Sequence, residues 1–154
     1  VRLIVSDTLF PLMYAYAEKA TRLSMAAIHQ FSLEHELSAP QLKALFFLQD
    51  SPQATINNVA GHFGFSKAAA SQTIDRLVER GLVNRQIDPD DRRTKRLSLT
   101  AQGKEKVAQA SQARRAWLHT LIDSFSAEEQ AALQPAFQIL LEGMHKVFSQ
   151  SDIS

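Results

Sequence analysis

The sequence predicts a mainly α-helical protein that carries one small antiparallel β-hairpin. Apolar residues recur at helical spacing over most of the 154 residues, and short clusters of Gly, Pro, Ser and Asp separate these runs. A turn sequence, residues 88–91 (Asp-Pro-Asp-Asp), lies between two short extended runs, as expected for a hairpin. The apolar content of 45%, with only five Gly and five Pro, is typical of an ordered chain.

The first predicted helix covers residues 7 to about 36, with Asp7 as its N-cap. Pro11 lies near its start, where the missing backbone N–H costs little. A helix of this length exceeds the mean of roughly 12 residues in globular proteins. We therefore expect it to pack against more than one partner.

Two shorter helices with a Gly-containing turn come next. One opens at Ser38 or Ala39 and stops near Asp50, and the following one covers residues 55–63 and is ended by Gly64. Glycine suits this turn because it adopts a positive φ without a steric penalty. Two helices separated by such a turn have the spacing of a helix-turn-helix.

The fourth predicted helix begins at Ser66, a good N-cap, and stops at Gly81, which suits the position after a helix end. Its apolar stripe consists of Ala70, Ile74, Leu77 and Val78. Two extended runs on either side of the Asp-Pro turn follow it. A helix that leads into a basic two-stranded ribbon fits the grooves of DNA, so we interpret residues 38–100 as a winged helix-turn-helix.

The positive charge of the chain is concentrated in this region. Residues 66–100 contain eight Lys and Arg against five Asp and Glu, a local charge of +3 in a chain whose net charge is +1. A local basic excess is what contact with phosphates requires. A solvated charged hairpin is the alternative, and the neighbouring helix pattern favours the DNA-binding interpretation.

Two further long helices are predicted after the hairpin, one capped by Thr100 and one opened by a capping box at residues 126–129. Together with the first helix they carry more apolar surface than a module of this size can bury. We expect residues 1–37 and 101–154 to form dimerisation helices around residues 38–100, giving a two-fold homodimer. A monomer with a self-contained helical cap is the alternative.

Several classes of protein are disfavoured by the composition. The chain has no cysteine, which excludes thiol sensing and Cys-based zinc sites and fits a reducing, cytoplasmic location. The longest apolar runs are too short to span a bilayer. The apolar stretch within the first residues is also too short for a secretory signal. No pair among the five His has the i, i+4 spacing of a helical metal site, and no catalytic constellation stands out, so we expect no cofactor.

The run Arg85-Gln-Ile-Asp88-Pro-Asp-Asp91-Arg92-Arg93, followed by Leu97-Ser-Leu-Thr100-Ala-Gln-Gly103, resembles the wing signature of the MarR family of bacterial regulators. The order and length of the helices agree with that family over essentially the whole chain. The resemblance implies a homodimeric transcription factor, usually a repressor, that binds double-stranded DNA and loses affinity when a ligand or oxidant acts.

The resemblance also implies which side chains face DNA. From the recognition helix and the wing these are Ser66, Lys67, Ala69, Ser71, Gln72, Arg76, Arg92, Arg93 and Lys95. Gln72 is the best candidate for base reading, because its amide can pair with both N6 and N7 of adenine, whereas Lys67 and Arg76 favour phosphate. A solvated helix surface is the alternative for each.

Arg92 or Arg93 is expected to enter the minor groove from the wing tip, where an A·T-rich groove has the strongest negative potential. The sequence does not distinguish between the two. Asp88 and Asp91 would repel phosphate, so we interpret them as a brace that holds the wing by ion pairing. An ordinary Asp-Pro turn is compatible with that role.

By the same resemblance, a small-molecule effector would bind between the DNA reader and the dimerisation helices. His29, Phe31, Phe46 and Phe47 lie in the right segments to line an apolar cleft with one polar group, although core packing is the simpler interpretation of each Phe. A protein-interaction module without DNA binding and a metal-responsive regulator remain as alternative functions. Activation in place of repression is compatible with the same residues.

Overall fold

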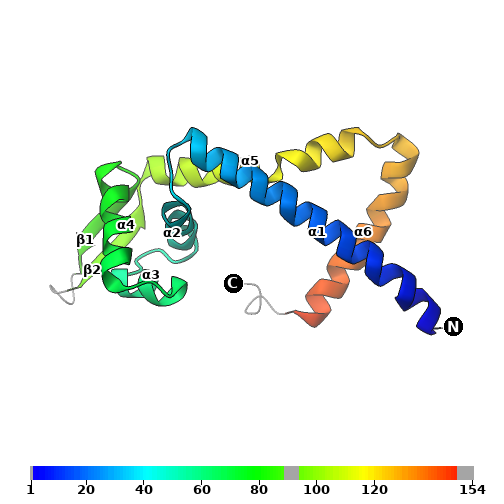
Figure 1. Ribbon diagram of the computed structural model, residues 1–154, viewed down its shortest axis with the longest axis horizontal. Helices are drawn as coiled ribbons and strands as arrows, with labels where there is room; N and C mark the ends of the chain where they lie inside the picture. The colour runs from blue at the N-terminus through cyan, green and yellow to red at the C-terminus, as the bar shows by residue number, and fades with distance from the viewer. Residues whose placement is uncertain (1, 89–93, 149–154) are drawn as a thin grey trace. The chain divides into compact units, whose positions relative to one another are not determined.

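The computed structural model describes residues 2–88 and 94–148, with side chains from residue 8 onward. It is mainly helical with one two-stranded antiparallel sheet, which confirms the predicted fold class (Figure 1). The elements are α1 (Arg2–Glu34), α2 (Ala39–Asp50), α3 (Ile56–Phe63), α4 (Lys67–Glu79), β1 (Val83–Ile87), β2 (Lys95–Leu99), α5 (Ala101–Asp123) and α6 (Ala127–Val147).

The chain forms two compact units, residues 1–115 and residues 116–154, which we call the first and second units. The first unit contains α1 to α4, the hairpin and the first part of α5. The second unit contains the rest of α5 and α6, so α5 runs through the boundary.

A single hydrophobic core occupies the first unit. It draws on the end of α1, on α2, α3 and α4, on both strands and on the start of α5. Its buried apolar residues are Phe31, Leu37, Leu42, Ala44, Leu45, Leu48, Ala54, Val59, Ala70, Ile74, Leu77, Leu82, Val83, Leu97, Leu99, Val107 and Ala110. We call residues 38–100, the winged helix-turn-helix, the reader. Because every element of the reader contributes to this core, burial of apolar surface fixes α4 and the hairpin in one arrangement.

The helix starts follow from side-chain caps that the sequence predicted. The Ser38 hydroxyl accepts from the N–H of Gln41 and the Ser66 hydroxyl accepts from the N–H of Ala69, so each satisfies a free amide of the first turn. The predicted turn glycines are confirmed as well, with φ of 64° at Gly64. Leu82 N–H bonds to Leu77 O after α4, which closes that helix as a Schellman motif.

Two local predictions were wrong. Asp7 does not cap the first helix, since α1 already begins at Arg2 and no Gly or Pro interrupts residues 2–6. Val78 does not belong to the buried stripe of α4, because it is 36% exposed while Ile74 and Leu77 are fully buried. At 3.6 residues per turn Val78 lies about 100° around the helix from Leu77 and therefore turns out of the core.

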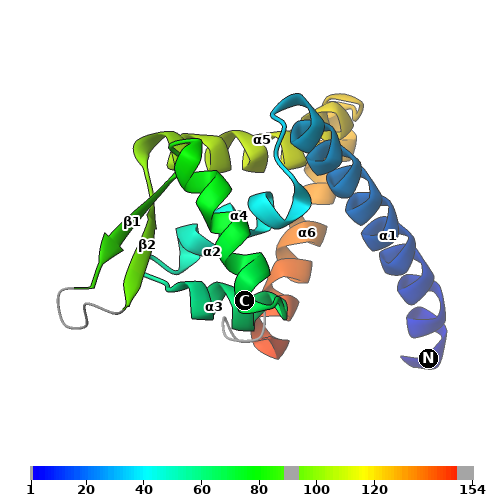
Figure 2. The same cartoon turned by 60° about the vertical axis from the view of Figure 1, so that its left-hand side comes forward.

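The hairpin is bonded through the outer edge of β2 to the segment before α3. β1 and β2 pair with Val83 opposite Leu99 and Ile87 opposite Lys95. On its other edge β2 receives the segment before α3: the Leu97 N–H donates to Ala54 O at 2.8 Å, and the Gln53 N–H donates to Leu97 O at 3.1 Å. Figure 2 shows the hairpin beside α3 and α4, and these bonds explain that placement.

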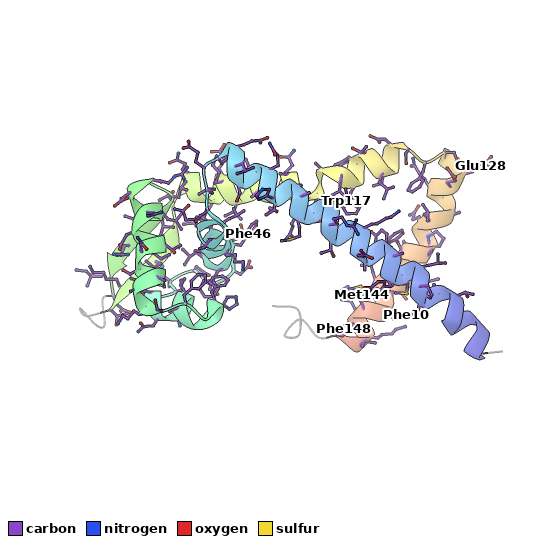
Figure 3. The ribbon with its side chains drawn as sticks, in the orientation of Figure 1. Phe10, Phe46, Trp117, Glu128, Met144 and Phe148 are labelled. Carbon is purple, nitrogen blue, oxygen red and sulfur yellow. The ribbon has the colours of Figure 1, made fainter. Side chains whose placement is uncertain are left out.

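In the second unit, α6 begins with the predicted capping box: the Ser126 hydroxyl accepts from the Glu129 N–H, and the Glu129 carboxylate accepts from the Ser126 N–H. None of the described side chains of α6 is buried in the single chain. Its exposed apolar residues include Phe137, Ile139, Leu141, Met144 and Val147, with Phe148 just beyond the helix. Figure 3 labels Met144 and Phe148. No helix in the described part of the chain is both long enough and apolar enough to cross a membrane.

Candidate nucleic-acid interface

The exposed face of α4 is defined by the residues that α4 buries. Ala70, Ile74 and Leu77 face the core and are 0% exposed. Gln72 lies about 200° around the helix from Ala70, so it projects directly away from the core. The predicted contact residues Ser66, Lys67, Ala69, Gln72 and Arg76 are all exposed. All five side chains are therefore accessible. Ala69, Gln72 and Arg76 share the face opposite the core, whereas Lys67 lies about 180° around the helix from Arg76.

Ser71 is the exception on this helix. Its hydroxyl donates to Asp75 Oδ2 at 3.2 Å, and Asp75 Oδ1 lies 2.6 Å from Arg85 Nη2 on β1. This network connects the recognition helix to the wing, and it engages the Ser71 hydroxyl that the sequence assigned to DNA. The Asp75–Arg85 pair escaped the sequence reasoning because its members are ten positions apart and on different elements.

A hollow of about 130 Å³ lies between the start of α3, the start of α4 and the turn end of β2. Thr55, Ile56, Asn57, Lys67, Thr94 and Lys95 line it. Its walls provide two ammonium groups together with hydroxyl and amide groups, and the N-terminus of α3 adds the positive end of a helix dipole. This chemistry suits an anion such as a backbone phosphate. The sequence singled out Lys67 and Lys95 but missed Thr55, Asn57 and Thr94.

The described part of the wing is held by an ion pair. Asp88 is 7% exposed, and its Oδ2 lies 2.5 Å from Nε of Arg96 on β2. The Asp88 N–H also donates to Thr94 O at 2.9 Å, which closes the hairpin at its last described pair. Arg92, Arg93 and Asp91 lie outside the described residues. The partner of Asp88 was not foreseen, since Arg96 was counted only among the basic residues.

The residues predicted to line an effector cleft differ in burial: the three Phe side chains pack in or against the core, whereas His29 is exposed. Phe31 is buried in the core and contacts the ring of His35 at 4.1 Å between centroids. Phe46 and Phe47 are partly buried against the same core, and Figure 3 shows Phe46 on α2.

Each of these rings finds its partner outside the predicted set. Arg114 lies over Phe46 at 5.8 Å, and His62 contacts Phe47 at 4.6 Å. His29 is exposed on α1. The cleft itself stays a prediction.

Among the described residues, no three His, Asp or Glu side chains come together as potential metal ligands. The hollow between α3, α4 and the wing likewise combines cationic and neutral polar groups rather than carboxylates.

Residues 37–95 match the model of the MarR family, a range that includes α2, α3, α4 and the start of β2. Over these residues the chain matches MarR-family transcriptional regulators. Proteins of the MarR family are regulators and not enzymes, which agrees with the absence of a catalytic constellation from the sequence. The winged helix-turn-helix prediction and the resemblance stated from the wing signature are thereby confirmed.

Relatives support the same assignment. The chain is similar to the HTH-type transcriptional regulator YsmB of Bacillus subtilis, with 28% identity over 133 residues that cover 84% of this chain and 91% of that protein. Its fold is similar to that of the transcriptional regulator Tm0710 of Thermotoga maritima, with a TM-score of 0.81 at 18% identity, covering 91% and 98% of the two chains.

A second similar fold is that of a mutant of S. aureus MepR bound to an oligodeoxyribonucleotide. The TM-score is 0.71 at 21% identity, and the match covers 86% of this chain and 97% of that chain.

Proposed function

We propose that this MarR-family regulator binds double-stranded DNA as a homodimer, reads a palindromic operator and represses transcription from it until a small-molecule effector acts. A regulator that reads an operator shares a compartment with the DNA, so the same proposal includes a cytoplasmic location. The observation that carries the proposal is the exposed face of α4 beside a hollow with two lysines.

The position of Gln72 suits base reading. It lies opposite the buried stripe of α4, in the middle of the helix, and its side chain is exposed. A side-chain amide can donate to N7 and accept from N6 of one adenine, a pairing that discriminates by about 1–3 kcal/mol against the wrong base. Ala69 lies on the same exposed surface, where its methyl group can contact a thymine methyl.

The hollow is suited to position the protein on the phosphate backbone. Lys67 and Lys95 line it from α4 and β2, together with residues at the start of α3. Such contacts fix register and supply affinity without sequence information. Ser66 and Arg76 are also exposed on α4, and we propose that they contact phosphates elsewhere along the helix.

The wing completes the proposed interface. The ion pair of Asp88 with Arg96 braces the turn end of the hairpin, and Asp91 is proposed to extend that brace. A braced hairpin would present Arg92 or Arg93 to the minor groove in a fixed direction, at a lower entropic cost on binding than a mobile one.

Unpartnered apolar surface supports the homodimer. α6 buries none of its described side chains in the single chain, and exposed apolar residues also occur along α1, among them Phe10, Leu12, Tyr14 and Met25. Apolar surface of this extent is unfavourable in water and is covered when the same helices of a second copy pack on it. A two-fold dimer would present two α4 helices to two half-sites, as a palindrome requires.

Salt dependence of DNA binding tests the proposal. Duplexes would first be selected from a random pool, and affinity for the selected duplex would be measured at 50–200 mM salt by fluorescence anisotropy. Affinity should fall steeply, because each phosphate contact releases counterions, and Lys67→Ala or Lys95→Ala should each reduce the salt slope by about 1. Lys43→Ala, which removes an exposed charge from α2, is the matched control and should leave the slope unchanged.

Gln72→Ala should relax the preference at one base pair per half-site, by about 1–3 kcal/mol, while other positions keep theirs. Equal weakening on all duplexes would instead identify Gln72 as a phosphate contact. If no duplex is selected at all, or if the salt response is flat, the DNA-binding proposal is wrong, and a protein-interaction role becomes the better interpretation.

A further inference from the structure

The end of α1 lies in a corner where α4 and α5 also meet. We call His35, Glu36, Arg80 and Lys106 the corner residues. Arg80 follows the last residue of α4, and its guanidinium donates from Nη1 to Glu36 O at 2.6 Å and from Nη2 to His35 O at 2.8 Å. Two nitrogens of one rigid planar group thus hold two consecutive carbonyls, so both the distance and the orientation between the helix ends are constrained.

The carbonyls that Arg80 binds belong to a helix end that requires such a partner. Glu36 has a left-handed φ of 51°, and the Leu37 N–H donates to Ser32 O at 2.9 Å, which closes α1 as a Schellman motif. A non-glycine residue in this conformation is strained and persists only when its surroundings hold it. The cationic Arg80 also faces the negative end of the α1 dipole, so it stabilises this ending.

Lys106 attaches α5 to the same corner. Its ammonium lies 3.3 Å from His35 Nδ1 and donates to Gln109 Oε1 at 3.0 Å, while the His35 ring packs on Phe31. The corner therefore joins the end of the proposed recognition helix to two of the three helices for which we propose a role in dimerisation.

The corner is one of few attachments of α1 to the reader. Within α1, the apolar residues that join the core are Ile28 and Phe31, both in the last two turns. The residues before them are mostly exposed. A long helix held near one end turns easily about that end, so contacts in the corner have a large influence on the direction of α1 relative to α4.

We propose that Arg80 is a positioning residue that sets the half-site spacing that the dimer reads. This inference rests on the proposed function, because it requires two recognition helices that act together on DNA. In such a dimer the two half-sites lie about one helical turn apart, roughly 34–36 Å, and each inserted base pair shifts and rotates one half-site relative to the other. If the corner is rigid, the second α4 cannot move to reach the displaced half-site. If the corner is loosened, it can.

The test compares Arg80→Ala with the unmodified protein on a set of duplexes. The duplex selected from the random pool would be rebuilt with one or two base pairs inserted or removed at its centre. The unmodified protein should lose at least about 10-fold in affinity for a one-pair change, since simultaneous engagement is lost when the geometry forbids it. Arg80→Ala should bind the original duplex more weakly, and its penalty for a one-pair change should fall by about fivefold.

Two further variants make the result specific. Arg80→Lys keeps the charge but cannot span both carbonyls in one plane, so its spacing penalty should lie between those of the other two proteins. It also decides the matter if Arg80→Ala does not fold. Lys43→Ala loses the same charge at an exposed site on α2 and should keep the original spacing profile.

The outcomes separate the inference from the proposed function. If both Arg80 variants bind more weakly by the same factor at every spacing, Arg80 is a stability or phosphate residue and the inference is overturned. If the unmodified protein itself binds all spacings equally, the two-site reader is wrong. Amide exchange of residues 33–38 provides a second measurement: it should quicken in Arg80→Ala while exchange in α2 stays slow, and unchanged exchange at 33–38 would count against the clamp.

Discussion

The two units of the chain differ in how far they bury their apolar side chains. The first unit collects side chains from α1 to α5 into one core that leaves residues such as Val59, Ile74 and Leu97 with no exposed surface. In the second unit, α6 has an equally apolar sequence but buries none of its described side chains. Burial of this core stabilises the first unit within one chain. The apolar surface of α6, in contrast, remains exposed to water in a single chain.

This contrast separates two tasks within one regulator. The reader must keep α4, the hollow and the wing in a fixed arrangement, and its core and its cross-element bonds achieve this within one chain. The helices for which we propose a role in dimerisation would be stabilised by a second copy, because an isolated amphipathic helix is marginal in water. Changes in the two units should therefore affect different measurable properties.

The largest effect is expected from Phe137→Glu on α6. Phe137 is 40% exposed in the single chain and belongs to the apolar side of the helix. In a dimer that covers this side, the new carboxylate would be buried without a partner, at a cost of several kcal/mol. The dissociation constant of the dimer should rise by at least about 100-fold, which sedimentation equilibrium would measure, since each 1.4 kcal/mol is tenfold.

Gln138→Glu is the control for that change, because it adds the same charge at the next position, which carries a polar side chain. It should leave the dimer intact. Equal dissociation in both variants would show that added charge alone separates the subunits, and the assignment of the apolar side of α6 would then be wrong.

The second largest effect is expected from Gly103→Ala at the start of α5. A Cβ at Gly103 would lie 2.0 Å from the backbone oxygen of Leu82, so the backbone around it would have to move. Overpacking of this kind costs about 1–3 kcal/mol, and this clash is with backbone, so we expect a loss near the upper end in urea unfolding. Gly61→Ala in α3 meets no atom within 4 Å and should stabilise by about 0.5–1 kcal/mol. A neutral Gly103→Ala would show that α5 does not pack tightly against Leu82.

Local patterns in the sequence were sufficient for most of the fold. Ser66 and Ser126 were recognised as caps, and Ser38 was one of two candidates, because a capping interaction involves residues only three positions apart. Gly64 and Gly81 were recognised because a positive φ restricts the residue type at that single position. Asp7 was wrongly predicted as a cap because a residue type that favours the N-cap can also occur inside a helix. The residues before Asp7 continue the helix back to Arg2.

The contacts that distinguish this site were not readable from the sequence. The ion pair of Asp75 with Arg85 and the hydrogen bonds of Arg80 to the end of α1 join residues ten and more than forty positions apart. Such pairs depend on how elements pack, and no periodicity reports them. The hollow was missed because its lining residues come from α3, α4 and β2, whose relative placement the sequence does not give. Whether Gln72 reads a base stays a prediction.

The smallest effects are expected from removing equivalent caps in the two units. Ser66→Ala and Ser126→Ala each remove a hydroxyl that accepts from a first-turn amide, at a cost of about 1 kcal/mol. In the first unit, α4 is part of the core, so Ser66→Ala should lower the free energy of unfolding of the whole unit by that amount. The measurement is chemical denaturation followed by circular dichroism.

Ser126→Ala should behave differently according to the state of the dimer. When α6 is packed against a second copy, the lost cap should lower the global stability by about 1 kcal/mol, because the helix unfolds together with the interface. In the Phe137→Glu background α6 has no such partner, and the same change should appear only as faster amide exchange within α6. The two substitutions are therefore expected to be coupled in a double-mutant cycle. Additive effects would mean that α6 unfolds together with the rest of its own chain whether or not the dimer forms. The proposed difference between the two units would then be wrong.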